Sequence, residues 1–406
     1  MTSVDVPYAV SRRASAIRAA EIRELLKLLD RPGMISFAGG IPDPSLFDLE
    51  RFRTAYEFAL AENGNALQYS TSEGYPPLRR WLARRMSQPG VDCTEGNILV
   101  THGSQQGLDL IGKLFLDPRS ALITEASTYL GALQSISACE QDFMTLRFRD
   151  GLAETNATAA GLIYLVPDFA NPTGRTMTLD ERGAALELAH RTGAVLVEDA
   201  TYTDLRYEGE RIPAIAALDI AACGSIEAAR TLYCGTFSKT LSPGLRVGWI
   251  CGPAKLIRRL TMIKQAGDLH TATINQQVLH RIAETGFDAT VDQARAAYAS
   301  RRNATLDALR RHAPVGVKWT EPAGGLFIWM TLPDGTDIAT LLEKAIERNV
   351  AFVPGTASFA DGSGKNTMRL SYSLLAEDVQ ETDVRILRGI MEEPLQARAS
   401  AGTKAA

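Results

Sequence analysis

Hydrophobic and polar residues along this chain follow two alternating patterns. Short runs of consecutive apolar residues, each passing into a loop, predict buried strands at Ile98–Thr101, Ala121–Thr124, Leu162–Val166, Ala194–Glu198, Thr231–Cys234 and Val247–Cys251. Apolar residues at helical spacing lie between them, as in the segment Gly107–Phe115. Buried strands separated by helices predict an α/β fold with a mostly parallel central sheet that helices flank.

Two other regions lie on either side of this alternating part. Apolar residues with a helical period predict an amphipathic helix over Arg18–Arg31 and a long helix from Asn275 to about Arg311. The C-terminal part combines three strand-like runs with one helical segment, at Gly316–Trp319, Leu326–Met330, Met368–Tyr372 and Ile338–Arg348.

These patterns predict two domains. We expect a large domain over 47–285 and a smaller α+β domain over 286–393. Residues 1–46 would form an arm and helix that join the small domain, and residues 394–406 a disordered tail.

Composition excludes several classes of function. The 406 residues carry a formal net charge of −4, so the chain offers no polycationic surface for nucleic acid or an anionic membrane. Apolar runs are too short to span a bilayer, and residues Met1 to Arg13 lack the apolar core of a secretory signal, so we expect a cytoplasmic protein. The five cysteines and five histidines form no CxxC pair, HExxH motif or Cys/His cluster, so no metal is expected. No GxGxxG follows a strand, which argues against dinucleotide binding.

The stretch from Thr236 to Trp249 carries the clearest chemical signal. Lys239 follows a buried strand, hydroxyl residues precede it, and a glycine-containing turn with Arg246 comes after it. This arrangement supplies an amine for a carbonyl cofactor and a cation with hydroxyls for a phosphate. Taken alone, the stretch would equally fit a surface lysine in a polar turn.

Two other strands end in polar residues of the same kind. Asn171 lies in the turn Asn-Pro-Thr-Gly after the strand Leu162–Val166, which would also fit a simple Asx turn. Asp199 ends the next strand, with Tyr202 three residues on. A buried carboxylate there needs a positive partner such as a pyridinium nitrogen, although it could instead cap a following helix.

These segments, in this order, resemble the pyridoxal-phosphate aminotransferases of fold type I (class I/II). The resemblance covers nearly the whole chain and is closest to the 2-aminoadipate/kynurenine aminotransferase group. Four motifs carry that closer likeness: Ser36-Phe-Ala-Gly-Gly-Ile-Pro, Leu67-Gln-Tyr-Ser, Gly103-Ser-Gln-Gln and Met368-Arg-Leu-Ser-Tyr. Departures from the family pattern are His102, where threonine is usual, Ala200, and Thr201, where alanine is common.

The resemblance implies roles for the residues around a pyridoxal 5'-phosphate cofactor. Lys239 would hold it as a Schiff base and move the proton, and Asp199 would pair with the pyridine nitrogen. Asn171 and Tyr202 would bind the phenolic oxygen of the ring, and Tyr129 would stack on the ring. Without the family, Tyr129 would be taken for a core aromatic.

The resemblance also implies a phosphate site and a homodimer. Phosphate ligands would be Ser104, the Gln105 backbone, Thr236, Ser238 and Arg246. Tyr69 resembles a tyrosine that reaches the phosphate of the partner subunit, which implies shared active sites.

Substrate recognition is predicted in less detail. Arg369 would bind the α-carboxylate of the substrate, as an arginine fork suits a carboxylate, although a surface ion pair was an alternative. Gly39 and Gly40 would line the pocket together with Asn171. Arg23 matches an arginine that binds a distal carboxylate in 2-aminoadipate enzymes, but it also lies on the solvated face of its predicted helix.

The implied activity is a ping-pong transamination. An L-α-amino acid (2-aminoadipate, leucine, aromatic or kynurenine-like) would give its amino group to 2-oxoglutarate. Another reaction of the same cofactor (lyase, decarboxylase or racemase) is the alternative. A regulator that senses a ligand with an aminotransferase-like domain would carry a winged-helix DNA-binding domain at its N-terminus. We disfavour this function, because the roughly forty residues before Gly39 are too few for such a domain.

Overall fold

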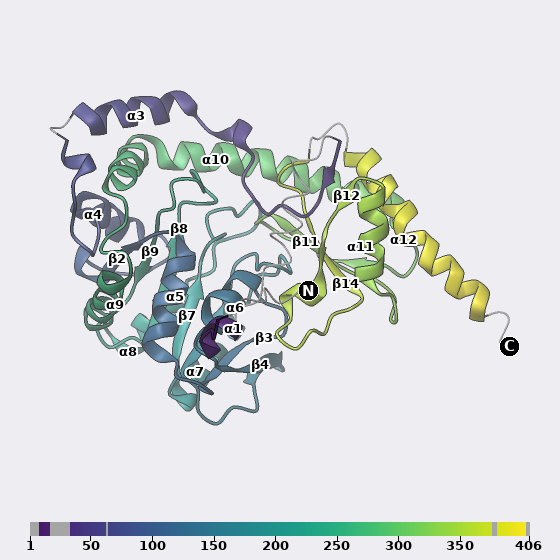
Figure 1. Ribbon diagram of the computed structural model, residues 1–406, viewed down its shortest axis with the longest axis horizontal. Helices are drawn as coiled ribbons and strands as arrows, with labels where there is room; N and C mark the ends of the chain where they lie inside the picture. Colours follow the sequence, from purple (N-terminus) through teal and green to yellow (C-terminus); the bar gives the residue numbers. More distant parts are fainter. Residues whose placement is uncertain (1–7, 17–32, 62–63, 376–379, 403–406) are drawn as a thin grey trace.

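The computed structural model describes residues 8–16, 33–61, 64–375 and 380–402. The helix predicted over Arg18–Arg31, with Arg23, therefore lies outside the described residues. In Figure 1 the large sheet and its helices lie on the left and the smaller sheet on the right, with α10 (Thr273–His312) running between the two parts. Gly286, with φ 167° and ψ 34°, interrupts the helical backbone of α10.

The large sheet has the strand order β2-β9-β8-β7-β6-β3-β4-β5. Its neighbours β8, β7, β6, β3 and β4 are parallel, whereas β9 and β5 run antiparallel to theirs. The strands are β2 (Ile98–Thr101), β3 (Ala121–Glu125), β4 (Asp142–Arg149), β5 (Leu152–Glu154), β6 (Leu162–Leu165), β7 (Val195–Asp199), β8 (Thr231–Thr236) and β9 (Gly248–Cys251). The mostly parallel α/β sheet predicted from the sequence is confirmed.

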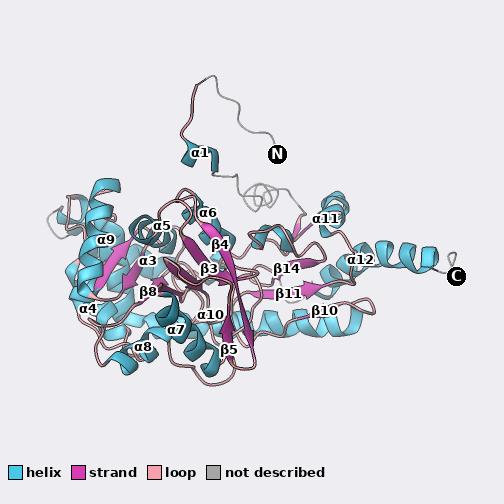
Figure 2. Cartoon of the chain, turned by 90° about the horizontal axis from the view of Figure 1, so that it is seen from below, coloured by secondary structure: helices cyan, strands magenta, loops and turns pink. Residues whose placement is uncertain are grey.

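Side chains on both faces of this sheet are buried. Along β6, Leu162 and Tyr164 join one apolar cluster, and Ile163 and Leu165 join another. This explains why the strand is apolar at every position, since neither face meets water. The helices around the sheet, visible in cyan in Figure 2, are α3 (Leu49–Ala61), α4 (Pro76–Arg85), α5 (Ser104–Phe115), α6 (Leu130–Ser137), α7 (Leu179–Thr192), α8 (Ile215–Cys223) and α9 (Ala254–Gly267).

The smaller part is built on an antiparallel sheet of order β10-β11-β14-β13. A separate parallel pair joins β1, near the N-terminus, to β12. Helices α11 and α12 pack together, and α12 also packs on α10. The elements are β1 (Ile35–Ser36), β10 (Lys318–Trp319), β11 (Phe327–Thr331), α11 (Ile338–Glu347), β12 (Val350–Ala351), β13 (Val353–Pro354), β14 (Thr367–Ser371) and α12 (Gln380–Gly402).

Three elements differ from the sequence-based expectation. The hairpin of β4 and β5 was not predicted, although its turn residues Asp150 and Gly151 have φ values of 51° and 76°, as a two-residue hairpin turn requires. Helix α12 continues to Gly402, past the start of the expected tail at residue 394. A short helix, α1 (Arg12–Ala16), also precedes the predicted N-terminal helix.

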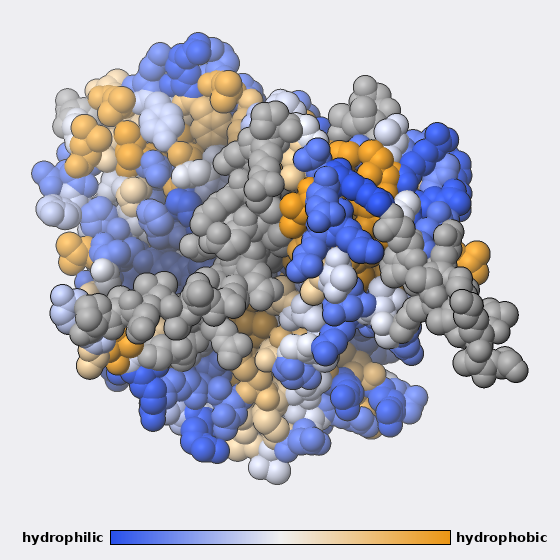
Figure 3. Space-filling view, turned by 45° about the vertical axis from the view of Figure 1, so that its right-hand side comes forward, coloured by the Kyte–Doolittle hydropathy of each residue, from blue (hydrophilic) through white to orange (hydrophobic). Residues whose placement is uncertain are grey.

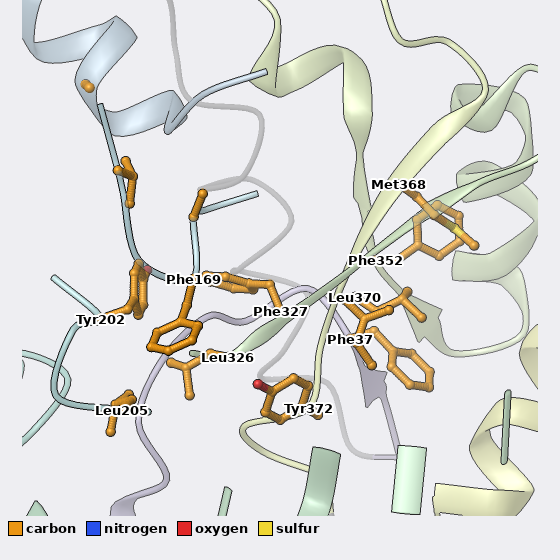
Figure 4. Packing of buried hydrophobic residues seen from close by; sticks show 14 of the residues in the cluster. Phe37, Phe169, Tyr202, Leu205, Leu326, Phe327, Phe352, Met368, Leu370 and Tyr372 are labelled. Atoms are coloured by element: carbon orange, nitrogen blue, oxygen red, sulfur yellow. The ribbon is translucent and has the colours of Figure 1, made fainter. Parts of the chain in front are cut away.

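One continuous apolar cluster joins the two parts of the molecule. In Figure 4, Phe327 of the small sheet lies between Tyr202 and Phe169 on one side and Leu370 and Phe37 on the other. The Phe327 and Tyr202 rings meet edge to face, 5.6 Å between centroids. This cluster holds the small sheet firmly against the loops that follow β6 and β7, where the polar residues of interest lie.

The outer surface is mixed in character. Over the residues that the structure describes, no helix is long and apolar enough to cross a membrane. On the face drawn in Figure 3, blue hydrophilic residues lie beside orange hydrophobic ones.

Candidate active site

A cavity of about 360 Å³ opens where the parallel strands of the large sheet end. Neighbouring strands β6 and β8 are followed by the segments that carry Asn171 and Lys239, and β7 between them ends in Asp199. In a parallel sheet these carboxyl ends share one edge, so residues far apart in sequence come together there. The small sheet supplies the opposite wall through Phe327 and Arg369.

Most of the residues singled out from the sequence line this one cavity. They are Gly40, Ser104, Gln105, Tyr129, Asn171, Asp199, Tyr202, Thr236, Ser238, Lys239, Arg246 and Arg369. Gly39 does not line the cavity but is buried beside it, where its carbonyl oxygen accepts a hydrogen bond from Ser373. Arg23 is outside the described residues. Tyr69 is 78% exposed and lies outside the cavity.

Lys239 is positioned by the turn after β8. Its Nζ atom donates a hydrogen bond to the carbonyl oxygen of Gly40 at 2.7 Å. Burial, and then the nearby cations Arg369 and Arg246, lower the pKa of the Lys239 amine to about 8, against the opposing effect of Asp199. A substantial fraction of this amine is therefore neutral near physiological pH and able to act as a nucleophile or base.

Asp199 is the acidic group of the cavity and is only 2% exposed. Burial raises the pKa of its carboxyl group, while hydrogen bonds from Thr201 and Tyr164 and the charge of Lys239 act in the opposite direction. Neither Thr201 nor Tyr164 was singled out as a partner of Asp199 from the sequence. The turn after β7 is not a helix, so Asp199 does not cap one.

Arg369 is 4% exposed in the middle of β14 and is not part of a surface ion pair. Its Nη1 donates to Asn171 Oδ1 at 2.7 Å, and its Nη2 donates to the Ala38 carbonyl oxygen at 2.8 Å. The guanidinium carbon lies 4.3 Å from the centre of the Phe327 ring. Its Nε is buried without a hydrogen-bond partner. Burial lowers the pKa of Arg369 to about 10, so it remains a cation at neutral pH.

Asn171 links this arginine to Tyr202. Since its Oδ1 accepts from Arg369, its amide group is left to bond the Tyr202 hydroxyl. Burial raises the pKa of Tyr202, so the phenol stays protonated and can donate. The pair therefore presents donors to an oxygen atom in the cavity.

The far end of the cavity is suited to an anion. Ser104 and Gln105 begin helix α5, whose first N–H groups have no partner within the helix. Thr236 and Ser238 hydroxyls lie 2.9 Å apart beside them. The Arg246 guanidinium lies over the turn, since a Cβ on Gly103 would meet its Nη2 at 2.6 Å.

Tyr129 closes one side of the cavity at the start of α6. Its hydroxyl lies 3.4 Å from the Oε1 of Gln105, whose Nε2 donates to the Gly131 carbonyl oxygen at 2.6 Å. Hydrogen bonds thus join Tyr129 and the start of α6 to Gln105 at the start of α5.

Several wall residues escaped the sequence analysis. They are Ala38, Ile41, Leu130, Gly131, Gln134, Val166, Thr201, Pro243 and Phe327. Most are small or apolar, and their types carry no local sign of a site, since the same residues fill cores elsewhere. Val166 and Thr201 were the exceptions that position could have indicated, because Val166 ends a predicted strand and Thr201 lies just beyond another.

The donor set fits a phosphorylated aromatic aldehyde. Three cations, Lys239, Arg246 and Arg369, surround the cavity with one buried carboxylate, Asp199. Arg246 lies at the anion-binding turn, Lys239 carries a nucleophilic amine, and the Nε of Arg369 has no hydrogen-bond partner among the described residues. Such a site can bind a phosphate and a carboxylate at once, with an amine between them.

The sequence of this chain is similar to those of known aminotransferases. Residues 35–384 match the family model described as aminotransferase class I and II. An aromatic-amino-acid aminotransferase from Thermococcus litoralis is 39% identical, the match covering 96% of each chain. A 2-aminoadipate transaminase from Thermus thermophilus is 40% identical, covering 94% of this chain and 97% of the relative.

Solved structures agree with the sequence relatives. The α-aminoadipate aminotransferase of Thermus thermophilus, complexed with N-(5'-phosphopyridoxyl)-L-leucine, has a TM-score of 0.87 and 37% identity. The superposition covers 96% of this chain and 98% of that one. The likeness therefore extends over both sheets and the cavity between them.

Proposed function

The chain belongs to the aminotransferase class I and II family and is a pyridoxal-phosphate-dependent transaminase, and we propose that it moves the amino group of an L-α-amino acid to 2-oxoglutarate. One observation carries the proposal. The Lys239 amine, with its lowered pKa, lies in a single cavity with Asp199, the anion-binding turn and the Arg369 guanidinium. Pyridoxal phosphate supplies an aldehyde that condenses with amines and a ring that withdraws electrons from the adjacent carbon.

The residues present would hold this cofactor at three points. Arg246, the start of α5 and the hydroxyls of Thr236 and Ser238 would bind its phosphate. Asp199 would accept a hydrogen bond from the protonated ring nitrogen, and Tyr129 would cover one face of the ring. Asn171 and Tyr202 would donate to the ring oxygen.

Lys239 would act twice. Its amine would hold the cofactor covalently and, when free, would take and return the substrate's α-proton. The pKa of about 8 keeps the amine close to the operating pH, as a general base requires. The hydrogen bond to Gly40 directs its Nζ toward the small sheet, where Arg369 lies.

Arg369 would bind the α-carboxylate. Its Nη1 and Nη2 are already engaged by Asn171 and Ala38, which fix the plane of the guanidinium. The buried Nε has no hydrogen-bond partner among the described residues and would supply a donor for the incoming carboxylate. Gly40 lets the Phe327 ring pack close beside this site, since an added Cβ there would meet the ring at 2.4 Å.

The choice of amino acid is the finer part of the proposal. The cavity lining includes Ile41, Leu130 and the amide of Gln134, a mixed set that suits both apolar and polar side chains. We propose a broad donor range that includes 2-aminoadipate, leucine, aromatic amino acids and kynurenine-like ones. Relatives named for aromatic amino acids and for 2-aminoadipate support this range.

Arg23 remains a predicted ligand of a distal carboxylate. An Arg23→Ala variant should lose activity with 2-aminoadipate by about tenfold or more relative to leucine, because a charge-assisted hydrogen bond is lost. An unchanged ratio of the two activities would remove Arg23 from the recognition site.

The proposed reaction is tested with a panel of amino donors against 2-oxoglutarate. Formation of glutamate and of the matching 2-oxo acid in equal amounts, with parallel lines in double-reciprocal plots, is expected for a ping-pong transamination. Lys239→Ala should abolish turnover and the absorbance of the lysine-bound cofactor near ~430 nm. Release of ammonia or carbon dioxide without glutamate would favour a lyase or decarboxylase instead.

We propose a homodimer with shared active sites. Tyr69 is 78% exposed beside Leu67, which is 71% exposed, and its ring contacts only the edge of His270 among the ring pairs of the described residues. Such exposure is unusual for neighbouring large apolar residues and supports a place at a subunit interface. A Tyr69→Phe variant that keeps its oligomeric state but binds cofactor less tightly would support the shared site, and unchanged cofactor binding would contradict it.

The proposed compartment is the cytoplasm. All five cysteines are free thiols in the structure, which is what a reducing compartment allows.

A further inference from the structure

Asp199 receives hydrogen bonds from neutral hydroxyl groups on both carboxylate oxygens. The Tyr164 hydroxyl donates to Oδ2 at 2.7 Å, and the Thr201 hydroxyl donates to Oδ1 at 2.6 Å. The Thr201 backbone N–H adds a longer bond to Oδ1 at 3.3 Å. We call these two side chains, Tyr164 and Thr201, the hydroxyl clamp.

Strand register explains how Tyr164 reaches Asp199. Strands β6 and β7 are parallel, and Tyr164 is opposite Val197. Asp199 follows Val197 by two residues and so points to the same face of the sheet. The phenol is long enough to cross to the neighbouring strand and reach the carboxylate. Tyr164 is 2% exposed, so its hydroxyl has no water to bind in place of Asp199.

Thr201 approaches from the other side. It lies in the turn after β7 and lines the cavity itself, unlike Tyr164, which is behind the carboxylate. The threonine at position 201 thus gives Oδ1 a side-chain donor. An alanine at this position would leave Oδ1 with only the weaker backbone bond.

The clamp leaves capacity for one more partner. Each carboxylate oxygen has two lone pairs, and each hydroxyl occupies one of them. The Thr201 N–H takes the second on Oδ1, so one lone pair of Oδ2 is left. In the described part of the chain, the ionisable groups that interact with Asp199 or Tyr164 include Lys239, Tyr129, Tyr202 and Cys234. None of these donates a hydrogen bond to the carboxylate among the described contacts, so a ligand N–H can reach it.

Desolvation and hydrogen bonding oppose each other at this carboxyl group. Burial raises the pKa of Asp199, and the hydrogen bonds from Thr201 and Tyr164 lower it. Burial also holds the pKa of Tyr164 well above its ordinary value, so the phenol remains a donor at any working pH. Replacing the two hydroxyls by apolar groups of the same shape therefore removes both side-chain donors to Asp199 and keeps the rest of each side chain.

We propose that Tyr164 and Thr201 are positioning residues that keep Asp199 an oriented, charged acceptor for the ring nitrogen of the cofactor. This inference rests on the proposed function, since it assigns the nitrogen to Asp199. The clamp acts through Asp199 and contacts no reacting atom. By holding the ring nitrogen protonated, it strengthens the electron withdrawal on which proton removal by Lys239 depends.

The test uses isosteric variants of the full-length holoenzyme. Tyr164→Phe and Thr201→Val each remove one hydroxyl and keep the shape of the side chain. Each should raise the dissociation constant of pyridoxal phosphate about tenfold, as expected for losing a hydrogen bond to a charged group. Each should also raise the midpoint of the pH titration of the lysine-bound cofactor's absorbance by about half a unit or more, because a less positive ring makes the linking nitrogen more basic.

Two further variants separate positioning from simple packing. Thr201→Ser keeps the hydroxyl and should restore both values. Tyr298→Phe removes another buried hydroxyl, which accepts a bond from Asp43 N–H at 3.0 Å and does not line the cavity, and should change stability alone.

The outcomes are distinct. If Tyr164→Phe and Thr201→Val change only stability, as Tyr298→Phe does, and leave the dissociation constant and the midpoint unchanged, the clamp is overturned. That result would leave the transaminase assignment intact as long as the unmodified protein still forms glutamate. A parent protein that neither binds pyridoxal phosphate nor forms glutamate would instead sink the proposed function itself.

Discussion

The Nζ atom of Lys239 donates a hydrogen bond to the carbonyl oxygen of Gly40, 2.7 Å away, although 199 positions separate the two residues. Lys239 follows β8 of the large sheet, whereas Gly40 follows β1, which pairs with β12 beside the small sheet. The bond therefore ties the N-terminal segment across the cavity to the reactive amine. Burial of the amine is the main cause of its lowered pKa.

The first prediction concerns the pH dependence of cofactor capture. Because the pKa of Lys239 is lowered to about 8, its neutral form makes up roughly a tenth at pH 7, against well under a thousandth for an ordinary lysine. The rate of capture by the cofactor-free protein should rise with pH and level off above about pH 8. Stopped-flow absorbance near ~430 nm measures it. Nα-acetyl-lysine amide, in which only the ε-amine can react, is the control, and a protein midpoint as high as that of this compound would contradict the prediction.

A second prediction concerns Gly40. An added Cβ would lie 2.4 Å from the end of the Phe327 ring, which is 1% exposed and packed on Tyr202. Gly40→Ala should therefore displace Phe327 or the Gly40 carbonyl and lower kcat/KM at least about tenfold, since small misplacements in a site are costly. Gly183→Ala in helix α7, where nothing lies within 4 Å of the new Cβ, should keep full activity and gain up to about 1 kcal/mol of stability. Equal activity of the two variants would show that the Phe327 wall is not rigid.

A third prediction concerns Arg369. Arg369→Gln removes the cation but keeps a side chain that can bond Asn171, so the cofactor should still bind. Loss of a charge-assisted carboxylate contact should lower kcat/KM for amino acids by about 100-fold. Steady-state kinetics and cofactor titration measure the two effects separately. If cofactor binding fell while kcat/KM per loaded site stayed constant, Arg369 would be a structural residue and not a substrate ligand.

The strands and the residues directly after them could be predicted from sequence because their signals are local. Ile98–Thr101 was placed with the bounds of β2, and Lys239 and Asp199 were found as polar residues following apolar strands. The hairpin of β4 and β5 was missed because half-exposed strands with charged residues have no apolar run. Its Asp150-Gly151 turn was the available signal.

Other parts of the site depend on long-range packing that no local pattern encodes. Phe327 reaches the cavity because the small sheet folds back on the large one, and its own neighbours in sequence are ordinary core residues. Tyr164 was recognised only as part of a strand, since its bond to Asp199 depends on the register of β6 with β7. The family resemblance supplied the roles of Tyr129 and Tyr69, which the residues alone did not indicate.

The last prediction concerns the buried ion pair beneath the Asn171 turn. Asp168 accepts hydrogen bonds from Arg182 Nη2 at 2.7 Å and Arg206 Nη2 at 2.8 Å, and from the Thr203 hydroxyl at 3.1 Å. Arg182 is fully buried and Asp168 is 3% exposed. A buried cation whose counter-charge is removed keeps its desolvation cost without compensation.

Asp168→Asn should therefore lower the free energy of unfolding by about 3–5 kcal/mol, because it leaves the Arg182 charge buried and unpaired. Glu50→Gln breaks an exposed pair with Arg53 and should cost less than about 1 kcal/mol. Urea unfolding of both variants measures the difference. Since Asp168 is three residues before Asn171, the same variant should also lower kcat/KM through the displaced turn, whereas Glu50→Gln should not. A small stability loss together with a large activity loss would mean that the ion pair serves the Asn171 turn more than the fold.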